Sequence, residues 1–266
     1  AVSMGRMWVT ANALLEFSMR AFIPCKDHVP YNVNFYSAWL GFSDMGFETI
    51  PYFDPSELLG VERGDVVVGG IGSCQAVLRR FGVQIPQINY PESLTPFLGR
   101  ELWRSTINQV NNDIKSWPLF VKPVEDKKFT GKVIKGISDL VGCGISGENP
   151  PVICSEVVDF GAEWRCFVRY GEVLDVRPYK GDWRLHFDPS TIESAVKEYR
   201  DAPAGYGIDF GVTADRRTLL VEVNDGYALG CYGLQHDLYA QLLSARWSEL
   251  MGVEDELSYI GVHSGM

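Results

Sequence analysis

The segment Leu219-Leu220-Val221-Glu222-Val223-Asn224-Asp225-Gly226 contains the most informative pattern in the sequence. It is rich in apolar and β-branched residues and ends in glycine, which predicts a β-strand. Because side chains alternate between the two faces of a strand, Glu222 and Asn224 are expected to share one face. The other face is expected to be apolar and to hold Leu219, Val221 and Val223.

A second strand is predicted just before this one, because Ile208, Phe210 and Val212 alternate with Asp209. If Asp215 and Arg216 form the centre of the connecting turn, Asp209 lies directly opposite Glu222. Two facing carboxylates repel each other and favour a positive group between them. A divalent cation such as Mg²⁺, held by oxygen atoms of Asp209, Glu222 and Asn224, would meet that need. In an isolated hairpin, a polar face in contact with water is the more common explanation.

The composition is that of a globular protein, with 46% hydrophobic and 22% charged residues among 266. This length is sufficient for two domains. The net charge of −10 argues against broad binding to nucleic acid or to anionic membranes. The six cysteines show no CxxC spacing, so neither a zinc site nor a disulfide framework is indicated, and a cytoplasmic setting fits best. No signal peptide or apolar run of transmembrane length is apparent.

The first third of the chain alternates between strand and helix patterns. Predicted elements are a strand at Arg20–Pro24, a helix at Asn34–Met45, strands at Glu48–Phe53 and Asp65–Val68, and a helix at Cys74–Phe81. The glycine-rich turn Gly69–Ser73 precedes this last helix and could present amides to an anion. It lacks the GxGxxG pattern, and similar turns are common in α/β domains without a ligand.

The remaining two thirds mix strands and helices. Helices are predicted at Leu98–Ile114, Pro189–Arg200 and Leu234–Met251, and strands at Trp117–Pro123, Val133–Ile134, Val152–Phe160, Ala162–Tyr170 and Glu172–Tyr179.

Several basic residues occur at positions suited to binding an anion. Lys122 closes an apolar strand, so its ammonium group must reach an anion or extend to solvent. Lysines in the loop Asp126–Lys132 surround Thr130-Gly131, which could close over phosphates or form a solvated hairpin tip. Arg165 and Arg177 could bind phosphate or carboxylate through two hydrogen bonds each, or could pair with nearby acids for structural reasons.

Taken in order, these features define a composite pattern. Its parts are Phe120-Val121-Lys122-Pro123, Thr130-Gly131-Lys132, Glu163-Trp164-Arg165, Asp209 and Glu222-Val223-Asn224. With these motifs, the chain resembles the ATP-grasp superfamily. Within it, the chain is most similar to the small clade, associated with phages and bacteria, that is defined by one arginine and two lysines. The resemblance covers residues 100–235.

The resemblance implies an α+β and α/β fold in which two α+β subdomains sandwich ATP. This ATP-grasp domain would occupy residues 96–266, after a small Rossmann-like α/β domain at residues 1–95. It further implies that ATP is bound by Lys122, Lys132, Glu156, Val157, Val158, Glu163 and Arg165, with the backbone of residues 156–158 at the adenine and Glu163 at the ribose. Asp209, Glu222 and Asn224 would hold Mg²⁺ or Mn²⁺.

The implied activity is that of an ATP-dependent carboxylate–amine ligase acting through an acylphosphate. Arg165 and Arg177 would stabilise the oxyanion, with Arg177 at the substrate carboxylate, and Lys132 would contact the phosphates during turnover. The alternatives are a kinase that stops at phosphoryl transfer and a nucleotide-binding module without catalysis. The substrates would be a carboxylate and an amine on a small molecule, peptide or protein, with no nucleic-acid or membrane partner. The sequence leaves the substrates and the oligomeric state open.

Overall fold

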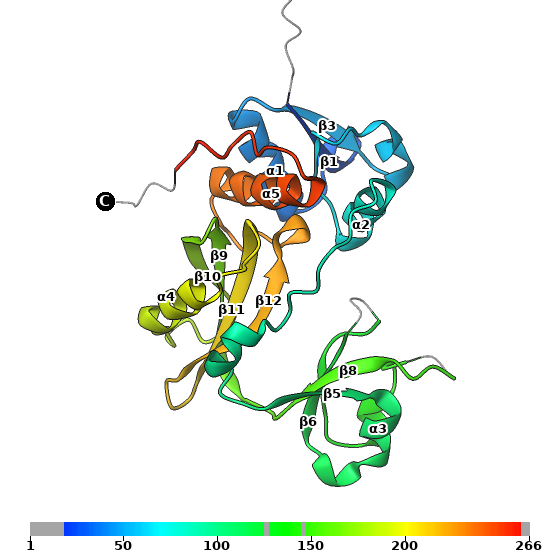
Figure 1. Ribbon diagram of the computed structural model, residues 1–266, viewed down its shortest axis with the longest axis vertical. Helices are drawn as coiled ribbons and strands as arrows, with labels where there is room; N and C mark the ends of the chain where they lie inside the picture. The colour runs from blue at the N-terminus through cyan, green and yellow to red at the C-terminus, as the bar shows by residue number, and fades with distance from the viewer. Residues whose placement is uncertain (1–18, 125–127, 145–146, 262–266) are drawn as a thin grey trace, which may run out of the picture.

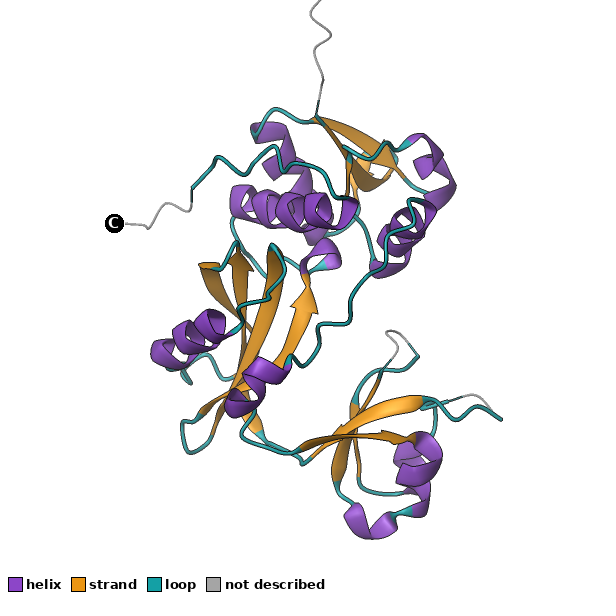
Figure 2. Cartoon of the chain, in the orientation of Figure 1, coloured by secondary structure: helices purple, strands orange, loops and turns teal. Residues whose placement is uncertain are grey.

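The computed structural model describes residues 19–124, 128–144 and 147–261. These residues form three lobes, each built around a four-stranded sheet. Figure 2 shows that helices cover the upper sheet, whereas the middle and lower sheets face each other across the centre of the molecule. No helix in the described part of the chain is long and apolar enough to cross a membrane.

The N-terminal lobe has a sheet whose central strand, β1, pairs in parallel with β3 and β4 and antiparallel with β2. Asn32 begins its first helix by accepting a hydrogen bond from the backbone amide of Phe35 at 3.0 Å. The elements are β1 (Arg20–Lys26), β2 (Val29–Pro30), α1 (Val33–Asp44), β3 (Glu48–Tyr52), β4 (Val66–Val67) and α2 (Ile71–Arg80). The predicted alternation of strands and helices is therefore present.

The small lobe contains an antiparallel sheet of order β5-β8-β6-β7. Its elements are β5 (Leu102–Thr106), α3 (Ile107–Asn112), β6 (Leu119–Pro123), β7 (Lys132–Ile134) and β8 (Pro151–Ser155). The helix predicted at Leu98–Ile114 is wrong over its first half, because β5 pairs with β8 from Leu102 to Thr106. Only Ile107–Asn112 is helical, and Thr106 and Gln109 form a capping box at its start.

The large lobe contains an antiparallel sheet of order β10-β9-β11-β12, with helix α4 against one face. Its elements are β9 (Phe160–Arg169), β10 (Glu172–Gly181), α4 (Pro189–Glu198), β11 (Gly205–Thr213) and β12 (Thr218–Asp225). Asp209 lies directly opposite Glu222, as predicted.

The turn between β11 and β12 differs from the predicted one, and a bulge compensates for the difference. The amide of Thr213 donates to the carbonyl of Arg217, which leaves a three-residue loop with Arg216 at a φ of 64°. The register then shifts by one at Val221, which has no partner on β11. As a result, Leu220 and Val223 pack in the core, and Val221 lines a cavity beside Glu222. The predicted apolar face of Leu219, Val221 and Val223 is therefore wrong.

The last helix, α5 (His236–Met251), returns to the N-terminal lobe. It packs against α1, and its side chains belong to the same hydrophobic core as those of β1. Trp247, which is 1% exposed, donates from its indole nitrogen to the carbonyl of Asp65 at 2.6 Å. The helix ends at Gly252, whose φ of 67° favours glycine. The two ends of the described chain therefore share one core.

Candidate active site

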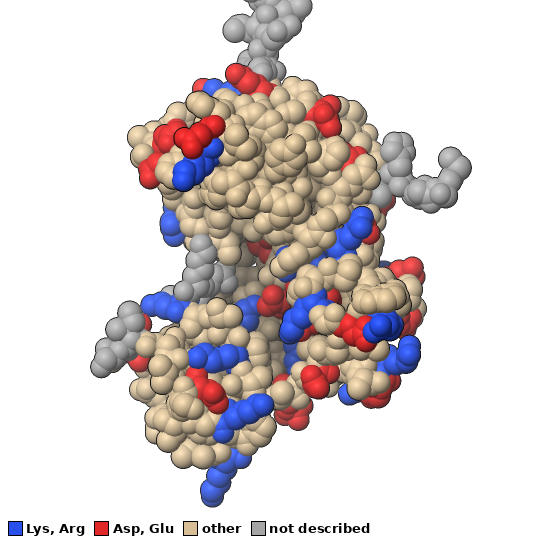
Figure 3. Space-filling view, turned by 180° about the vertical axis from the view of Figure 1, so that it is seen from behind, with Lys and Arg blue, Asp and Glu red and all other residues tan. Residues whose placement is uncertain are grey.

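A cavity of about 910 Å³ lies between the small lobe and the large lobe. Small-lobe residues, including Phe120 and Lys122, line one side, and large-lobe residues, including Asp209 and Glu222, line the other. Seen from behind in Figure 3, the molecule is hollowed between these lobes, and side chains of both signs lie along the hollow. A cavity of this size between two lobes is typical of a small-molecule site.

Four charged residues form a row across the large sheet, because each lies directly opposite the next on neighbouring strands. Arg177 on β10 faces Arg165 on β9, Arg165 faces Asp209 on β11, and Asp209 faces Glu222 on β12. Residues opposite each other in antiparallel strands point to the same side of the sheet. The row therefore presents two positive and then two negative side chains on one face.

Asp209 and Arg165 form a buried ion pair with two hydrogen bonds. Nε and Nη2 of Arg165 each donate to an oxygen of the Asp209 carboxylate at 2.7 Å, and the two residues are 7% and 1% exposed. Burial would lower the pKa of Arg165, but the hydrogen bonds and charge of Asp209 outweigh it and raise that pKa. Burial raises the pKa of Asp209 and outweighs the effect of Arg165. Removal of either partner would therefore leave the other charge buried without compensation, which would destabilise the fold.

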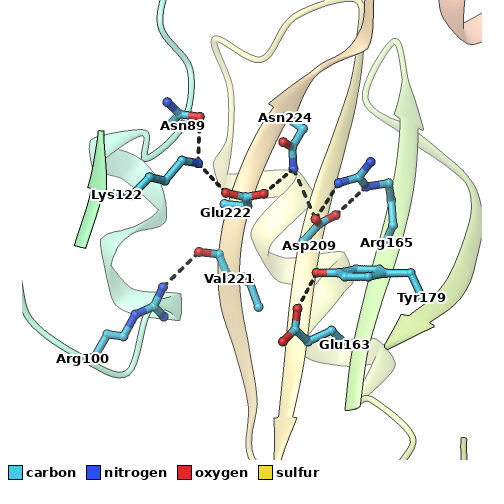
Figure 4. A network of polar contacts seen from close by, with 10 residues as sticks. All are labelled: Asn89, Arg100, Lys122, Glu163, Arg165, Tyr179, Asp209, Val221, Glu222 and Asn224. Atoms are coloured by element: carbon cyan, nitrogen blue, oxygen red, sulfur yellow. Dashed lines mark hydrogen bonds and ion pairs between the residues drawn. The ribbon is translucent and has the colours of Figure 1, made fainter. Parts of the chain in front are cut away.

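Glu222 connects the two lobes through an ion pair with Lys122 (Figure 4). The Lys122 ammonium also lies 3.4 Å from Oδ1 of Asn89. Burial would raise the pKa of Glu222, but the charge of Lys122 and hydrogen bonds from Lys122 and Asn224 lower it. The nearby carboxylates therefore differ, with the pKa of Glu222 lowered and that of Asp209 raised.

Asn224 lies between the two carboxylates. Its amide nitrogen donates to Oδ2 of Asp209 at 3.2 Å and to Oε1 of Glu222 at 3.1 Å. Lys122 and Arg165 supply the positive charge that the two acids require, so charge repulsion alone does not demand a metal. The three side chains nevertheless fit a hard cation, since rotation of the Asn224 amide would bring a third oxygen toward the two carboxylates. No cluster of three His, Cys, Asp or Glu side chains suited to a metal exists among the described residues.

A second polar group surrounds Glu163 in the same cavity. The Tyr179 hydroxyl donates to Oε2 of Glu163 at 2.8 Å, and the Lys180 ammonium contacts Oε1. Tyr179 stacks on Tyr232 with ring centroids 5.2 Å apart, and the Arg165 guanidinium lies 4.9 Å from the Tyr232 ring centroid. Aromatic faces beside a guanidinium hold it in place and shield it from water.

The remaining side of the cavity is formed by Glu156, Val157 and Val158 and by the glycine loop. Residues 156–158 follow β8 without strand pairing, so the predicted strand Val152–Phe160 ends early, at Ser155. In the loop, Thr130 and Gly131 line the cavity, and a Cβ on Gly131 would lie 2.7 Å from the Phe120 ring. The loop backbone therefore approaches the cavity wall closely, while Asp126 and Lys127 fall outside the described residues.

Most of the residues predicted for the site meet at this cavity. Lining it are Lys122, Glu156, Val157, Val158, Glu163, Arg165, Asp209 and Glu222. Asn224 joins them through its hydrogen bonds. Lys132 does not line the cavity, and its ammonium donates to the carbonyl of Val141 at 2.8 Å. Arg177 does not line it either, and pairs with Asp175 at 2.5 Å.

If the chain turns over ATP as the resemblance implies, Arg177→Lys should change that turnover by no more than about twofold, since surface substitutions usually cost less than about 0.5 kcal/mol. The physical reason is that the Arg177 side chain is 40% exposed, lies outside the cavity and has Asp175 as a partner that lysine also reaches. Steady-state kinetics on both proteins checks this. A loss of turnover greater than tenfold would return Arg177 to the predicted role at the substrate carboxylate.

Tyr90 and Arg100 are among the cavity residues that had no role in the sequence prediction. Arg100 donates to the carbonyls of Leu220 at 2.6 Å and Val221 at 2.9 Å, which fixes the small lobe to the edge of β12 (Figure 4). The Lys122 ammonium lies over the ring of Tyr90, 5.6 Å from the ring centroid. Tyr90 comes from the irregular connection between lobes, where no periodic pattern identifies it. Arg100 lies in the segment predicted as the helix Leu98–Ile114, and the helical pattern gave no indication of a contact with β12.

The comparisons with known proteins agree with this architecture. Solved structures of N5-carboxyaminoimidazole ribonucleotide synthetase from Thermotoga maritima and N5-carboxyaminoimidazole synthetase from Staphylococcus aureus are similar, each with a TM-score of 0.50. Identities are 14% and 10%, and the alignments cover 89% and 90% of this chain and 76% and 79% of those chains. D-alanine–D-alanine ligase from Bacillus anthracis has a TM-score of 0.49 at 13% identity, covering 88% of this chain and 98% of that one. For the two synthetases, the likeness at such identities concerns the fold alone.

No curated protein sequence matches the chain. A family model that describes an ATP-grasp domain, the second family of the clade named for one arginine and two lysines, matches residues 97–242. The match includes the cavity residues of both lobes from Arg100 to Tyr232. It confirms the resemblance and the ATP-grasp fold that the ordered motifs implied. Because it covers more than half of the sequence, the chain belongs to this clade of ATP-grasp domains.

Proposed function

We propose that this protein is an ATP-dependent carboxylate–amine ligase that forms an amide or peptide bond. The observation that carries the proposal is the contact of Lys122 on the small lobe with Glu222 on the large lobe, inside a cavity of about 910 Å³. This contact brings a cation and an acidic group from opposite sides of the cavity to one place. Such a pair suits a polyphosphate accompanied by a divalent cation.

In this proposal, residues 156–158 meet the adenine, Glu163 binds the ribose hydroxyls, and Lys122 and Arg165 bind phosphate. Lys122 and Arg165 exchange part of their contact with the two acids for contact with the nucleotide. Asp209, Glu222 and Asn224 hold Mg²⁺, which would neutralise negative charge on the phosphates when bound. Tyr179 and Tyr232 shield Arg165 from water, which strengthens its interaction with an anion.

The proposed reaction has two steps. A carboxylate oxygen attacks the γ-phosphorus, the bond from that phosphorus to the β,γ-bridging oxygen breaks, and ADP leaves. An amine nitrogen then attacks the acyl carbon, the carbon–oxygen bond to phosphate breaks, and the amine loses a proton. Arg165 is suited to both steps because its planar guanidinium can contact two oxygens of the transferring group.

Trapping the acylphosphate with hydroxylamine tests this reaction. The purified protein is incubated with ATP, Mg²⁺ and a panel of carboxylic acids, and both ADP and hydroxamate are measured. We expect ADP and hydroxamate to form in equal amounts with at least one class of acid. A phosphorylated product that does not react with hydroxylamine would indicate a kinase. If the protein binds nucleotide but forms ADP with none of the acids, it is a nucleotide-binding module without catalysis.

We expect Lys122→Ala to weaken ATP binding by about tenfold or more, since a charge-assisted hydrogen bond to phosphate is lost. Lys132→Ala is the matched control, because Lys132 lies on the neighbouring strand but donates to the carbonyl of Val141. Its affinity for ATP should stay close to that of the parent. Calorimetric titration with a non-hydrolysable ATP analogue measures both. Equal losses in the two variants would contradict the assignment of Lys122 and would favour a phosphate role for the glycine loop.

A further inference from the structure

A second cavity, of about 430 Å³, lies between the N-terminal lobe and the large lobe. Helix α2 contributes Ile71, Gln75 and Arg79 to its wall, and the segment that follows β12 contributes Tyr227 and Leu229. Gln75 donates from its amide nitrogen to the hydroxyl of Tyr227 at 3.0 Å, which joins the two lobes across the cavity. The family comparison assigns nothing to α2, which lies outside the matched residues 97–242.

A chain of polar contacts separates this cavity from the larger one. It runs from Asn89 through Lys122, Glu222, Asn224 and Asp209 to Arg165 (Figure 4). The larger cavity is lined by Lys122, Glu222, Asp209 and Arg165, and the smaller one by Asn89, Asn224 and Arg165. Arg165 therefore lines both, and a group bound in the smaller cavity beside it lies next to the proposed phosphate site.

The charges around the smaller cavity favour an anion. Its one acidic side chain among the described lining residues, Asp225, is neutralised by Arg246 through hydrogen bonds of 2.7 and 2.6 Å. Arg165 is likewise paired with Asp209. Arg79 has no ion pair with any residue in the described part of the chain, and lies exposed in the last turn of α2. The excess positive charge is therefore that of Arg79.

The apolar part of the lining sets a further condition on the ligand. Ile71, Ile88 and Leu229 contribute apolar surface to the same lining as Arg79 on α2 and Arg165 on β9. A ligand that fills the cavity thus meets cations, apolar side chains and the polar partition. The cavity has about half the volume of the proposed nucleotide site, so its ligand is smaller than a nucleotide.

We infer that the smaller cavity binds the acid substrate, and that this acid is dianionic, with one carboxylate at the Arg165–Asn224 partition and a second anionic group at Arg79. The inference rests on the proposed function and adds the class of acid to it. The carboxylate at the partition is the one that attacks the γ-phosphorus. The anionic group at Arg79 orients the molecule and does not react, so Arg79 is a specificity residue and not a catalytic one.

Binding measured without turnover tests the inference. The protein, saturated with a non-hydrolysable ATP analogue and Mg²⁺, is titrated with the α,ω-dicarboxylates from succinate to pimelate, with glutamate, and with the monoamide of each. We expect at least one diacid to bind about tenfold more tightly than its monoamide. Arg79→Gln should remove that preference and leave the affinity for the ATP analogue unchanged.

The matched control is Lys197→Gln, which removes the same charge from the last turn of another ten-residue helix, α4. It should keep the preference for the diacid. If no diacid binds better than its monoamide, or if Arg79→Gln keeps the preference, the inference is wrong. A diacid that binds through Arg79 but gives no ADP with ATP would leave the acid site standing and would overturn the ligase reaction instead.

Discussion

Glu222→Gln is expected to lower Mg²⁺-dependent ATP turnover by about a hundredfold or more while the fold is retained. Glutamine has the same shape, and its amide oxygen can take the place of Oε2 and accept the hydrogen bond from Lys122, so the contact between lobes persists. The negative charge is lost, however, and with it one of the two carboxylates proposed to hold the cation. Initial rates over a range of Mg²⁺ concentrations, together with the melting temperature, measure both effects.

Glu193→Gln provides the control, because Glu193 is an exposed residue on α4 and its substitution makes the same change in charge. It should leave both measurements unchanged. A Glu222→Gln protein that turns over ATP at the parental rate and with the parental dependence on Mg²⁺ would remove Glu222 from the metal site. The pair with Lys122 would then be a structural contact between lobes.

Arg165→Met is expected to lower the free energy of unfolding by about 3–5 kcal/mol, because it leaves the Asp209 carboxylate buried without its cation. Nucleotide binding should also be lost. Substituting both partners, in Arg165→Met/Asp209→Leu, should recover most of the stability, since a buried ion pair can be replaced by apolar groups of similar size. Urea unfolding of the parent, both single variants and the double variant measures the coupling between the two residues.

The pH dependence gives a second readout of the same pair. Burial raises the pKa of Asp209 above its ordinary value of 3.8, and removal of Arg165 raises it further. In Arg165→Met, the folded protein therefore binds a proton more readily than the unfolded chain does. Relative to the double variant, its stability should be best at low pH and fall as the pH rises through the raised pKa. If the difference in unfolding free energy between Arg165→Met and the double variant did not depend on pH, Asp209 would not be left charged and buried.

Local patterns were sufficient to predict most of the strands and many of the residues that line the cavity. The pairing of Asp209 with Glu222 follows from alternation of side chains in two short strands. It is correct although the turn has three residues, because the bulge at Val221 restores the register. A bulge depends on how both strands pack against the rest of the sheet, so the sequence of one strand does not specify it. For that reason the apolar face of β12 was predicted incorrectly.

Other features depend on contacts between distant segments. Residues 102–106 have a helical pattern but form a strand, because β8, about fifty residues later, provides the pairing partner. Local sequence does not distinguish Arg165 from Arg177, since they lie on the two strands of the same predicted hairpin. Their partners distinguish them. Asp209 on β11 holds Arg165 in the cavity, whereas Asp175, which lies on β10 with Arg177, holds Arg177 outside the cavity. Arg100 and Asn89 acquire their contacts only when the lobes come together.

The return of α5 to the N-terminal lobe bears on how this protein can evolve. The family match ends at residue 242, inside the helix, whereas the hydrophobic core joins that helix to β1 and α1 at the other end of the chain. The segment that the family model recognises therefore shares one of its hydrophobic cores with residues outside it. Exchange of the first lobe between relatives by recombination would expose Tyr239 and Trp247 unless α5 were exchanged with it. Substitutions in β1 and α5 are thus expected to be correlated, although more than two hundred residues separate the two elements.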